Sequence, residues 1–187
     1  MTGALWSIML VALVASLGKD DGLQHVSKDP VESRLVQKPV TAISFQLRVD
    51  LTGNPGEVYD AITGDVSAWW DHHFSEEPRK FVLEARPGGR FIEIFDESGD
   101  GAVHATVIYA HRGERIRFAG PLGFSGRPVE IVTTYDFESL GPDQTRLEVS
   151  VNARGPLDEG DQRALRSVWR HFIFDRFEPY WEEKSAG

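Results

Sequence analysis

Residues 129–178 read VEIVTTYDFESLGPDQTRLEVSVNARGPLDEGDQRALRSVWRHFIFDRFE. Apolar and polar side chains alternate on both sides of Gly141-Pro142-Asp143, which predicts two antiparallel strands over 129–138 and 145–153. The side chains expected to face inward are Val129, Ile131, Thr133, Tyr135, Phe137, Leu147, Val149 and Val151. This hairpin therefore offers one mostly apolar face to a covering element.

A helical pattern follows the hairpin and supplies that cover. Asp158 is suited to cap the helix, which should run to about Glu178, because Pro179 should end or kink it. The side chains that share one side of the helix are Leu165, Val168, Trp169, Phe172, Ile173 and Arg176, with Phe174 and Phe177 widening that side. This arc is wider than packing on one sheet requires, so short helices or a partner must cover the excess. A homodimer contact or another protein partner through this helix stays open.

Five more strands are expected before the hairpin. Alternation over 43–51 predicts the first, and turns rich in Gly and Pro separate strands over 80–85, 90–96, 102–110 and 115–119. After the first strand, Asn54-Pro55-Gly56-Glu57 opens a short helix that Gly64 closes, and 66–70 should form a second short helical turn. Short connections favour antiparallel neighbours. The sequence thus predicts an α+β fold, a curved seven-stranded antiparallel meander around a long C-terminal helix.

The composition fits one globular domain with an N-terminal appendage. Of the 187 residues, 41% are hydrophobic and 26% are charged. We expect the domain over 41–183, preceded by a polar linker over 19–40. The net charge of -9 repels phosphate backbones and anionic lipids, so nucleic acid is not an expected partner. The absence of cysteine excludes disulfides and thiolate chemistry.

Residues 1–18 include an uncharged apolar run, ALWSIMLVALVASLG, over 4–18. The run is too short to cross a bilayer easily, so no stable membrane span is expected. Its length and the small residues Ala15, Ser16 and Gly18 fit a secretory signal peptide, although no basic residue precedes it. An uncleaved anchor and a misassigned start are the alternatives. The protein should be secreted or periplasmic if the signal is genuine, and otherwise cytoplasmic.

A curved sheet of this size leaves space that a single helix about 10 Å across cannot fill. Phe91, Glu93 and Phe95 share the predicted interior side of their strand. In the next strand, the side with Val103, Ala105, Val107 and Tyr109 is favoured as interior over the side with His104, Thr106 and Ile108. The residues expected to line a ligand cavity are Trp69, Trp70, Phe91, Glu93, Phe95, Tyr109, Phe118, Thr133, Tyr135, Leu165, Trp169, Phe172 and Arg176.

Two stretches resemble a known family. The sequence TGDVSAWW over 63–70, followed by LEARPGGRF over 83–91, resembles the signature of the START-like superfamily, which is also called SRPBCC and includes polyketide cyclases and Bet v 1-like proteins. Within it, the branch that the chain resembles most comprises homologues of the heat-shock-protein-90 ATPase activator. Further motifs are similar over 113–118 (GERIRF), 141–147 (GPDQTRL) and 174–177 (FDRF).

The resemblance implies a helix-grip fold over about 41–183. It also implies a deep pocket between sheet and C-terminal helix, which relatives use for lipids, polyketides, hormones and aromatic products. It does not imply one reaction, because the fold serves binders, cyclases and co-chaperones. The chain departs from the co-chaperone pattern by its export-like N-terminus and by lacking the companion domain of the true activator, which argues against chaperone activation.

The candidate chemistry centres on Glu93. Burial would favour its protonated form and suit a general acid or base, or a ligand anchor, but an ion pair with Arg176 is the favoured reading. Asp71, His72 and His73, with Glu76 and Glu77 close behind, suggest metal donors, yet no third ligand stands at a diagnostic spacing, so no metal or cofactor is expected and a loop at the pocket mouth is favoured. His104 and His171 are expected at the surface.

These observations favour a protein that binds or carries a hydrophobic or aromatic small molecule without catalysis. The first alternative is a cyclase, dehydratase or isomerase that transfers protons with Glu93 and with Tyr109 or Tyr135. The second is a co-chaperone-like module that binds a protein through the last helix.

Overall fold

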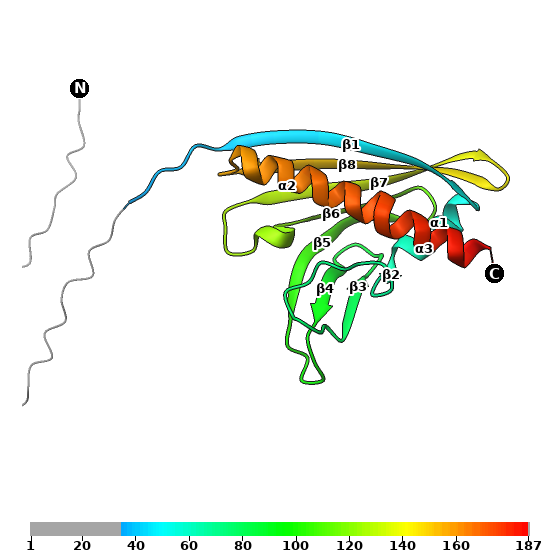
Figure 1. Ribbon diagram of the computed structural model, residues 1–187, viewed down its shortest axis with the longest axis horizontal. Helices are drawn as coiled ribbons and strands as arrows, with labels where there is room; N and C mark the ends of the chain where they lie inside the picture. Colours follow the sequence, from blue (N-terminus) through cyan, green and yellow to red (C-terminus); the bar gives the residue numbers. More distant parts are fainter. Residues whose placement is uncertain (1–34, 187) are drawn as a thin grey trace, which may run out of the picture. The chain divides into compact units, whose positions relative to one another are not determined.

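The computed structural model describes residues 35–186, so the expected signal peptide and most of the linker lie outside the described residues. Gln37–Gly187 form one unit (Figure 1). Its strands are Thr41–Thr52 (β1), Gly64–Asp65 (β2), Lys80–Leu83 (β3), Arg90–Ile94 (β4), Gly101–His111 (β5), Arg115–Gly120 (β6), Glu130–Gly141 (β7) and Gln144–Gly155 (β8). Its helices are Pro55–Ile62 (α1), Leu122–Phe124 (η1), Glu159–Arg170 (α2), His171–Phe177 (η2) and Glu178–Ser185 (α3).

All strands form one antiparallel sheet in the order β1-β8-β7-β6-β5-β4-β3-β2. The predicted meander is therefore confirmed, with eight strands instead of seven. The added strand, β2, is two residues long and pairs with β3. The predicted short helical turn over 66–70 is present as a single turn, in which the N–H of Trp70 donates to the carbonyl of Val66 at 2.9 Å. The segment between β1 and β3 therefore contains one helix, α1.

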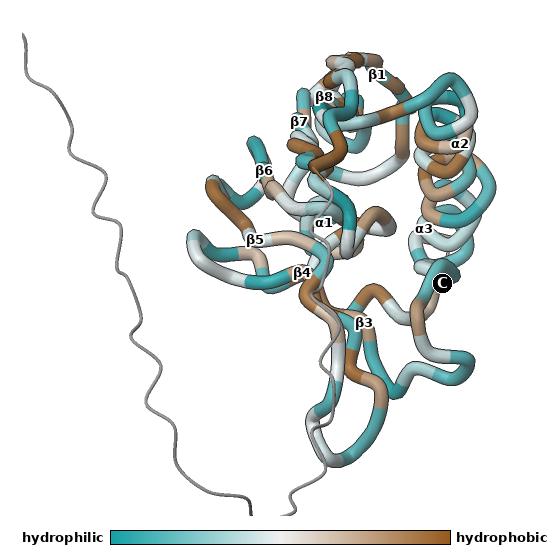
Figure 2. Tube along the Cα trace, turned by 90° about the vertical axis from the view of Figure 1, so that its left-hand side faces the viewer, coloured by the Kyte–Doolittle hydropathy of each residue, from teal (hydrophilic) through white to brown (hydrophobic). Residues whose placement is uncertain are grey.

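The C-terminal helix covers one face of the sheet and is continuous through α2, η2 and α3 (Figures 1 and 2). Asp158 caps it as predicted, accepting a hydrogen bond from the N–H of Asp161. Pro179 does not end it, so the helix runs to Ser185, past the predicted end at about Glu178. The π-helix η2 immediately precedes α3, and the N–H of Glu178 bonds to the carbonyl of Ile173, five residues back. Since proline has no N–H to donate, it is tolerated where the bonding pattern changes.

The hollow under the helix is filled at its centre by aromatic rings. The inward-facing residues predicted on β7 and β8, together with Val129 just before β7, are all buried, as are Leu165, Trp169, Phe172, Ile173 and Phe177 on the helix. Trp169 packs edge-on against Tyr135, with ring centroids 6.2 Å apart, and Trp69 packs against Phe177 at 5.2 Å. The space that remains lies toward the N-terminal half of the helix.

Two irregularities in the pairing of β5 change which of its side chains face the interior. On β4, Phe91 and Ile92 are adjacent, but their partners on β5 are Ala105 and Val103, so the ladder skips His104. A bulge of this kind turns an extra side chain to one face. His104 is consequently buried beside Ala105, whereas Val103 is 48% exposed. A second shift, between Val107 and Tyr109, leaves Tyr109 42% exposed. The preferred interior face was thus wrong at both ends of β5.

Candidate ligand-binding site

A cavity of about 300 Å³ lies beneath the first half of the C-terminal helix. Its walls come from the helix, from the η1 turn, from β5 and from residues 70–75, which we call the mouth loop. The lining residues are Trp70, His72, His73, Phe74, His104, Leu122, Gly123, Phe124, Ala164, Leu165, Val168, Trp169 and Phe172. The lining is mainly apolar, and its ionisable members are the three histidines. Such a lining suits an apolar ligand with few polar groups.

The helix forms one wall because its apolar residues recur every three to four positions. Leu165, Val168, Trp169 and Phe172 fall on one side of α2 and the start of η2. The ring of Phe172 stacks on that of Trp70, with centroids 3.7 Å apart and planes 19° apart. This stack fixes the mouth loop against the helix and closes that end of the cavity with aromatic surface.

The η1 turn forms the opposite wall in a strained conformation. Leu122 has a φ of 47°, and among the described residues it is the only one other than glycine with a positive φ. Arg127 holds the turn to the helix, because its guanidinium donates two hydrogen bonds to the Asp161 carboxylate at 2.8 and 2.7 Å. The same guanidinium lies 5.2 Å from the centre of the Phe124 ring. Strain held in place by surrounding contacts is common in binding sites.

The mouth loop is fixed to the sheet by what we call the inner anchor, Glu93 with His104. The Glu93 side chain is completely buried and accepts hydrogen bonds from the N–H of Phe74 at 2.9 Å and of Ser75 at 2.8 Å. Its third donor is His104 Nε2, at 3.0 Å. The pKa of His104 is lowered by burial, against the opposing influence of Glu93, so the neutral ring donates from Nε2. The predicted partner, Arg176, is therefore wrong, although the interior position of Glu93 was right.

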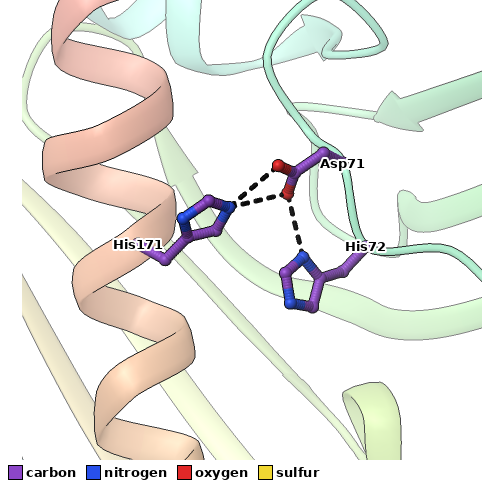
Figure 3. A group of neighbouring side chains, drawn as sticks. All are labelled: Asp71, His72 and His171. Atoms are coloured by element: carbon purple, nitrogen blue, oxygen red, sulfur yellow. Dashed lines mark hydrogen bonds and ion pairs between the residues drawn. The ribbon is translucent and has the colours of Figure 1, made fainter.

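The same loop is fixed to the helix by what we call the rim anchor, Asp71 with His72, His171 and Arg176. Figure 3 shows the first three of these residues. His171 Nε2 lies 3.0 Å from Asp71 Oδ1 and 2.8 Å from Oδ2, and His72 Nδ1 lies 2.9 Å from Oδ1. Burial opposes ionisation of Asp71, but hydrogen bonds from His72 and His171 and the nearby positive charge lower its pKa. Donor atoms of Asp71, His72 and His171 all lie within 4.8 Å of one another, so these three could hold a metal ion.

Four of the predicted site residues line this cavity: Trp70, Leu165, Trp169 and Phe172. Trp69, Phe91, Phe118, Thr133 and Tyr135 are buried in the packed centre instead. Phe95 is half-buried beyond the end of β4, and Tyr109 is exposed. Glu93 lies behind His104, and Arg176 reaches Asp71 and the Trp69 carbonyl at the rim.

Sequence reasoning missed His104, Phe74 and the η1 wall. His104 was expected at the surface because strict alternation ignores the bulge, and Phe74 belongs to a segment without periodicity. The Gly- and Pro-rich stretch around η1 was read only as a break between strands. The loop after Trp70 was correctly associated with the pocket mouth, since His72 and His73 line the cavity.

The fold and the site define a helix-grip protein of the START-like class. The family described as "Activator of Hsp90 ATPase homolog 1-like protein" matches residues 53–182, which is more than half of the chain. The chain belongs to this family, as its motifs suggested. The search of curated proteins found no match.

Solved structures support the fold. A protein from Rhodobacter sphaeroides is 16% identical with a TM-score of 0.55, over 79% of this chain and 99% of the other. A protein of unknown function from Staphylococcus aureus is 12% identical with a TM-score of 0.55, over 79% and 98%. The Aha1 dimer from Colwellia psychrerythraea is 15% identical with a TM-score of 0.50, over 75% and 96%. At these identities the likeness concerns the fold alone. In residues 35–186, no helix has the length and apolar character needed to cross a membrane.

Proposed function

We propose that this protein binds a small apolar or aromatic molecule in the cavity beneath its C-terminal helix. The observation that supports this proposal is the partly open cavity of about 300 Å³ walled by Trp70, Trp169 and Phe172. This volume lies at the lower end of the range for small-molecule sites, which favours a compact ligand. Burial of apolar ligand surface contributes about 25 cal/mol per Å², and the aromatic walls add edge and face contacts.

His104 gives the cavity a means to orient that ligand. Its Nε2–H is engaged by Glu93, so its other ring nitrogen, Nδ1, carries a lone pair and makes no hydrogen bond to any described residue. A ligand with one hydroxyl or N–H group could donate to this nitrogen while the rest of the molecule contacts apolar walls. The proposal therefore favours phenol-like or similarly amphipathic molecules over pure hydrocarbons.

The two other functions have less support from the geometry. Proton transfer by Glu93 with a tyrosine requires these groups to converge, but Tyr109 is exposed and Tyr135 is buried in the packed centre. Docking of a protein on the last helix requires an exposed apolar arc, but its large side chains are mostly buried against the sheet, with Val168 and Phe174 half-buried. Ligand binding, in contrast, requires only the cavity that remains between this helix and the sheet.

Two measurements test the proposal. Native mass spectrometry of gently purified protein, followed by organic extraction, should detect a bound molecule of low polarity. The neutral fluorescent probe N-phenyl-1-naphthylamine should bind the emptied protein with increased emission. A chain that is consistently empty and also fails to bind the probe contradicts the proposal.

A matched pair of variants locates the binding. Ala164 lines the cavity from α2, so Ala164→Phe should fill part of the space and weaken probe binding by about tenfold or more. Ser167 is exposed on the same helix and does not line the cavity, so Ser167→Phe should bind the probe like the parent protein. Equal binding by both variants would place the probe elsewhere.

A further inference from the structure

The mouth loop and the C-terminal helix bring two imidazoles and a carboxylate together. His171 stands 100 residues after Asp71 in the chain, yet Figure 3 shows its ring on one side of the Asp71 carboxylate and the ring of His72 close by. We propose that Asp71, His72 and His171 form a binding site for a divalent transition-metal ion, with Zn²⁺ as the reference ion. Imidazole and carboxylate donors are the usual ligands of such ions.

The Asp71 oxygen is close to the spacing that a metal requires from each of the two ring nitrogens. Asp71 Oδ1 lies 2.9 Å from His72 Nδ1 and 3.0 Å from His171 Nε2. In a tetrahedral zinc site with bonds of about 2.0–2.1 Å, neighbouring donors are about 3.3 Å apart. The two gaps from Asp71 Oδ1 must widen by a few tenths of an ångström to admit the ion, and the two ring nitrogens, which lie within 4.8 Å of each other, must settle at a similar spacing. The ion would then replace the hydrogen-bonded protons between these atoms.

Two further residues support the ligands from behind. Arg176 Nε lies 3.1 Å from Asp71 Oδ2, so the guanidinium can hold this oxygen while Oδ1 faces both rings. Asp175 Oδ2 lies 3.4 Å from His171 Nδ1 and can accept a hydrogen bond from an N–H there, which leaves Nε2 as the nitrogen that binds the metal. Carboxylates that orient metal-binding histidines in this way are common. The positive charge of Arg176 repels the ion, whereas its contact with Oδ2 orients the Asp71 carboxylate, so this residue acts in both directions.

The proposed site is open to solvent and supplies fewer ligands than the ion requires, as in sites that exchange their metal. The side chains of Asp71, His72 and His171 retain 33%, 51% and 31% of their exposure, so an ion can reach them from solvent. Three protein ligands leave at least one coordination position for water or another molecule. His72 also lines the cavity, so that position would lie near its mouth.

Titration of the full chain, freed of any affinity tag and of metal by chelation, tests this inference. Isothermal titration with Zn²⁺ should give one site per chain, and Co²⁺ should produce visible absorption typical of imidazole coordination. His171→Ala and His72→Ala should each weaken Zn²⁺ binding by more than about 100-fold, beyond the range for residues that only support a ligand. Asp175→Asn should weaken it less, within the 10–100-fold range known for supporting residues.

His73 provides the matched control, because it belongs to the same loop but lies outside the cluster. His73→Ala should bind Zn²⁺ like the parent protein. Circular dichroism of each metal-free variant checks that the fold is kept. The inference is overturned if the parent chain binds no Zn²⁺, or if His73→Ala loses as much affinity as His171→Ala. It does not depend on the cavity ligand, and the naphthylamine probe can be measured separately in the presence of chelator.

Discussion

The inner and rim anchors use the same pair of chemical groups at different depths. Each joins a carboxylate to a histidine and fixes the mouth loop, the inner anchor to the sheet and the rim anchor to the helix. The side chains of Glu93 and His104 are 0% and 6% exposed, whereas those of Asp71 and His171 are 33% and 31% exposed. The two anchors differ in burial, and the rim anchor adds a second histidine and Arg176.

This difference in depth predicts different roles. A buried carboxylate that loses its partners cannot be compensated by water, so the inner anchor should act as a structural bond. An exposed carboxylate can exchange its partners with water or a cation at little cost. The rim anchor should therefore contribute little to stability and remain open to exchange, as the proposed metal site requires.

The largest expected effect is the loss of the inner carboxylate. Glu93→Ala removes the acceptor for the N–H groups of Phe74 and Ser75 and for His104. Since unsatisfied buried groups cost about 1–3 kcal/mol each, we expect the free energy of unfolding to fall by about 3 kcal/mol or more. Urea unfolding followed by tryptophan fluorescence measures this change.

The control for Glu93→Ala is Glu138→Ala, which removes an exposed carboxylate from the same sheet. The urea concentration at the unfolding midpoint of Glu138→Ala should stay near that of the parent protein. If Glu93→Ala also unfolds at the parent midpoint, the mouth loop is not held by this carboxylate and the distinction between the anchors fails.

The fold could be predicted from the sequence because its signals are local and repeated. Alternation in β7 and β8 and the spacing of Leu165, Trp169 and Phe172 each identify a buried face without knowledge of the partner. The signals failed where the backbone is irregular. The bulge in β5 changed which side chains face the interior, and the π-helix η2 admits Pro179 in a way that no propensity indicates.

The site was less predictable, since its geometry depends on long-range contacts. Glu93 could be assigned to the interior from alternation, but its partner His104 depends on a bulge set by pairing with β4. Likewise, the donors of Asp71 and His72 are visible in the sequence, whereas His171 joins them only through the packing of the final helix. Residues that converge from distant segments have no diagnostic spacing.

An effect of intermediate size is expected from pH. Burial lowers the pKa of His104 below its ordinary value of 6.5, although the facing Glu93 carboxylate opposes this. As pH falls below about 6.5, the unfolded chain binds a proton at this histidine before the folded chain does, so stability decreases. One such proton contributes at most about 1.4 kcal/mol per pH unit. Above about pH 6.5, the contribution of His104 to the free energy of unfolding no longer changes with pH.

Urea unfolding between about pH 5 and 7.5 measures this dependence. His104→Gln removes the titrating group, so its stability should fall less steeply with acid than that of the parent chain. Identical slopes for His104→Gln and the parent would show that the inner anchor does not respond to protons.

The smallest effect is expected at the rim. Asp71→Asn keeps the shape of the side chain but removes the charge that faces His171 and Arg176. Exposed ion pairs contribute about 0–1 kcal/mol, so in the presence of chelator the free energy of unfolding should fall by less than about 1 kcal/mol. The same variant should lose Zn²⁺ binding, since an amide is a poor substitute for a carboxylate ligand. If Asp71→Asn loses as much stability as Glu93→Ala, the burial of the carboxylate does not determine the role of the two anchors. A small loss of stability together with abolished Zn²⁺ binding would instead assign structural support to Glu93 and metal exchange to Asp71.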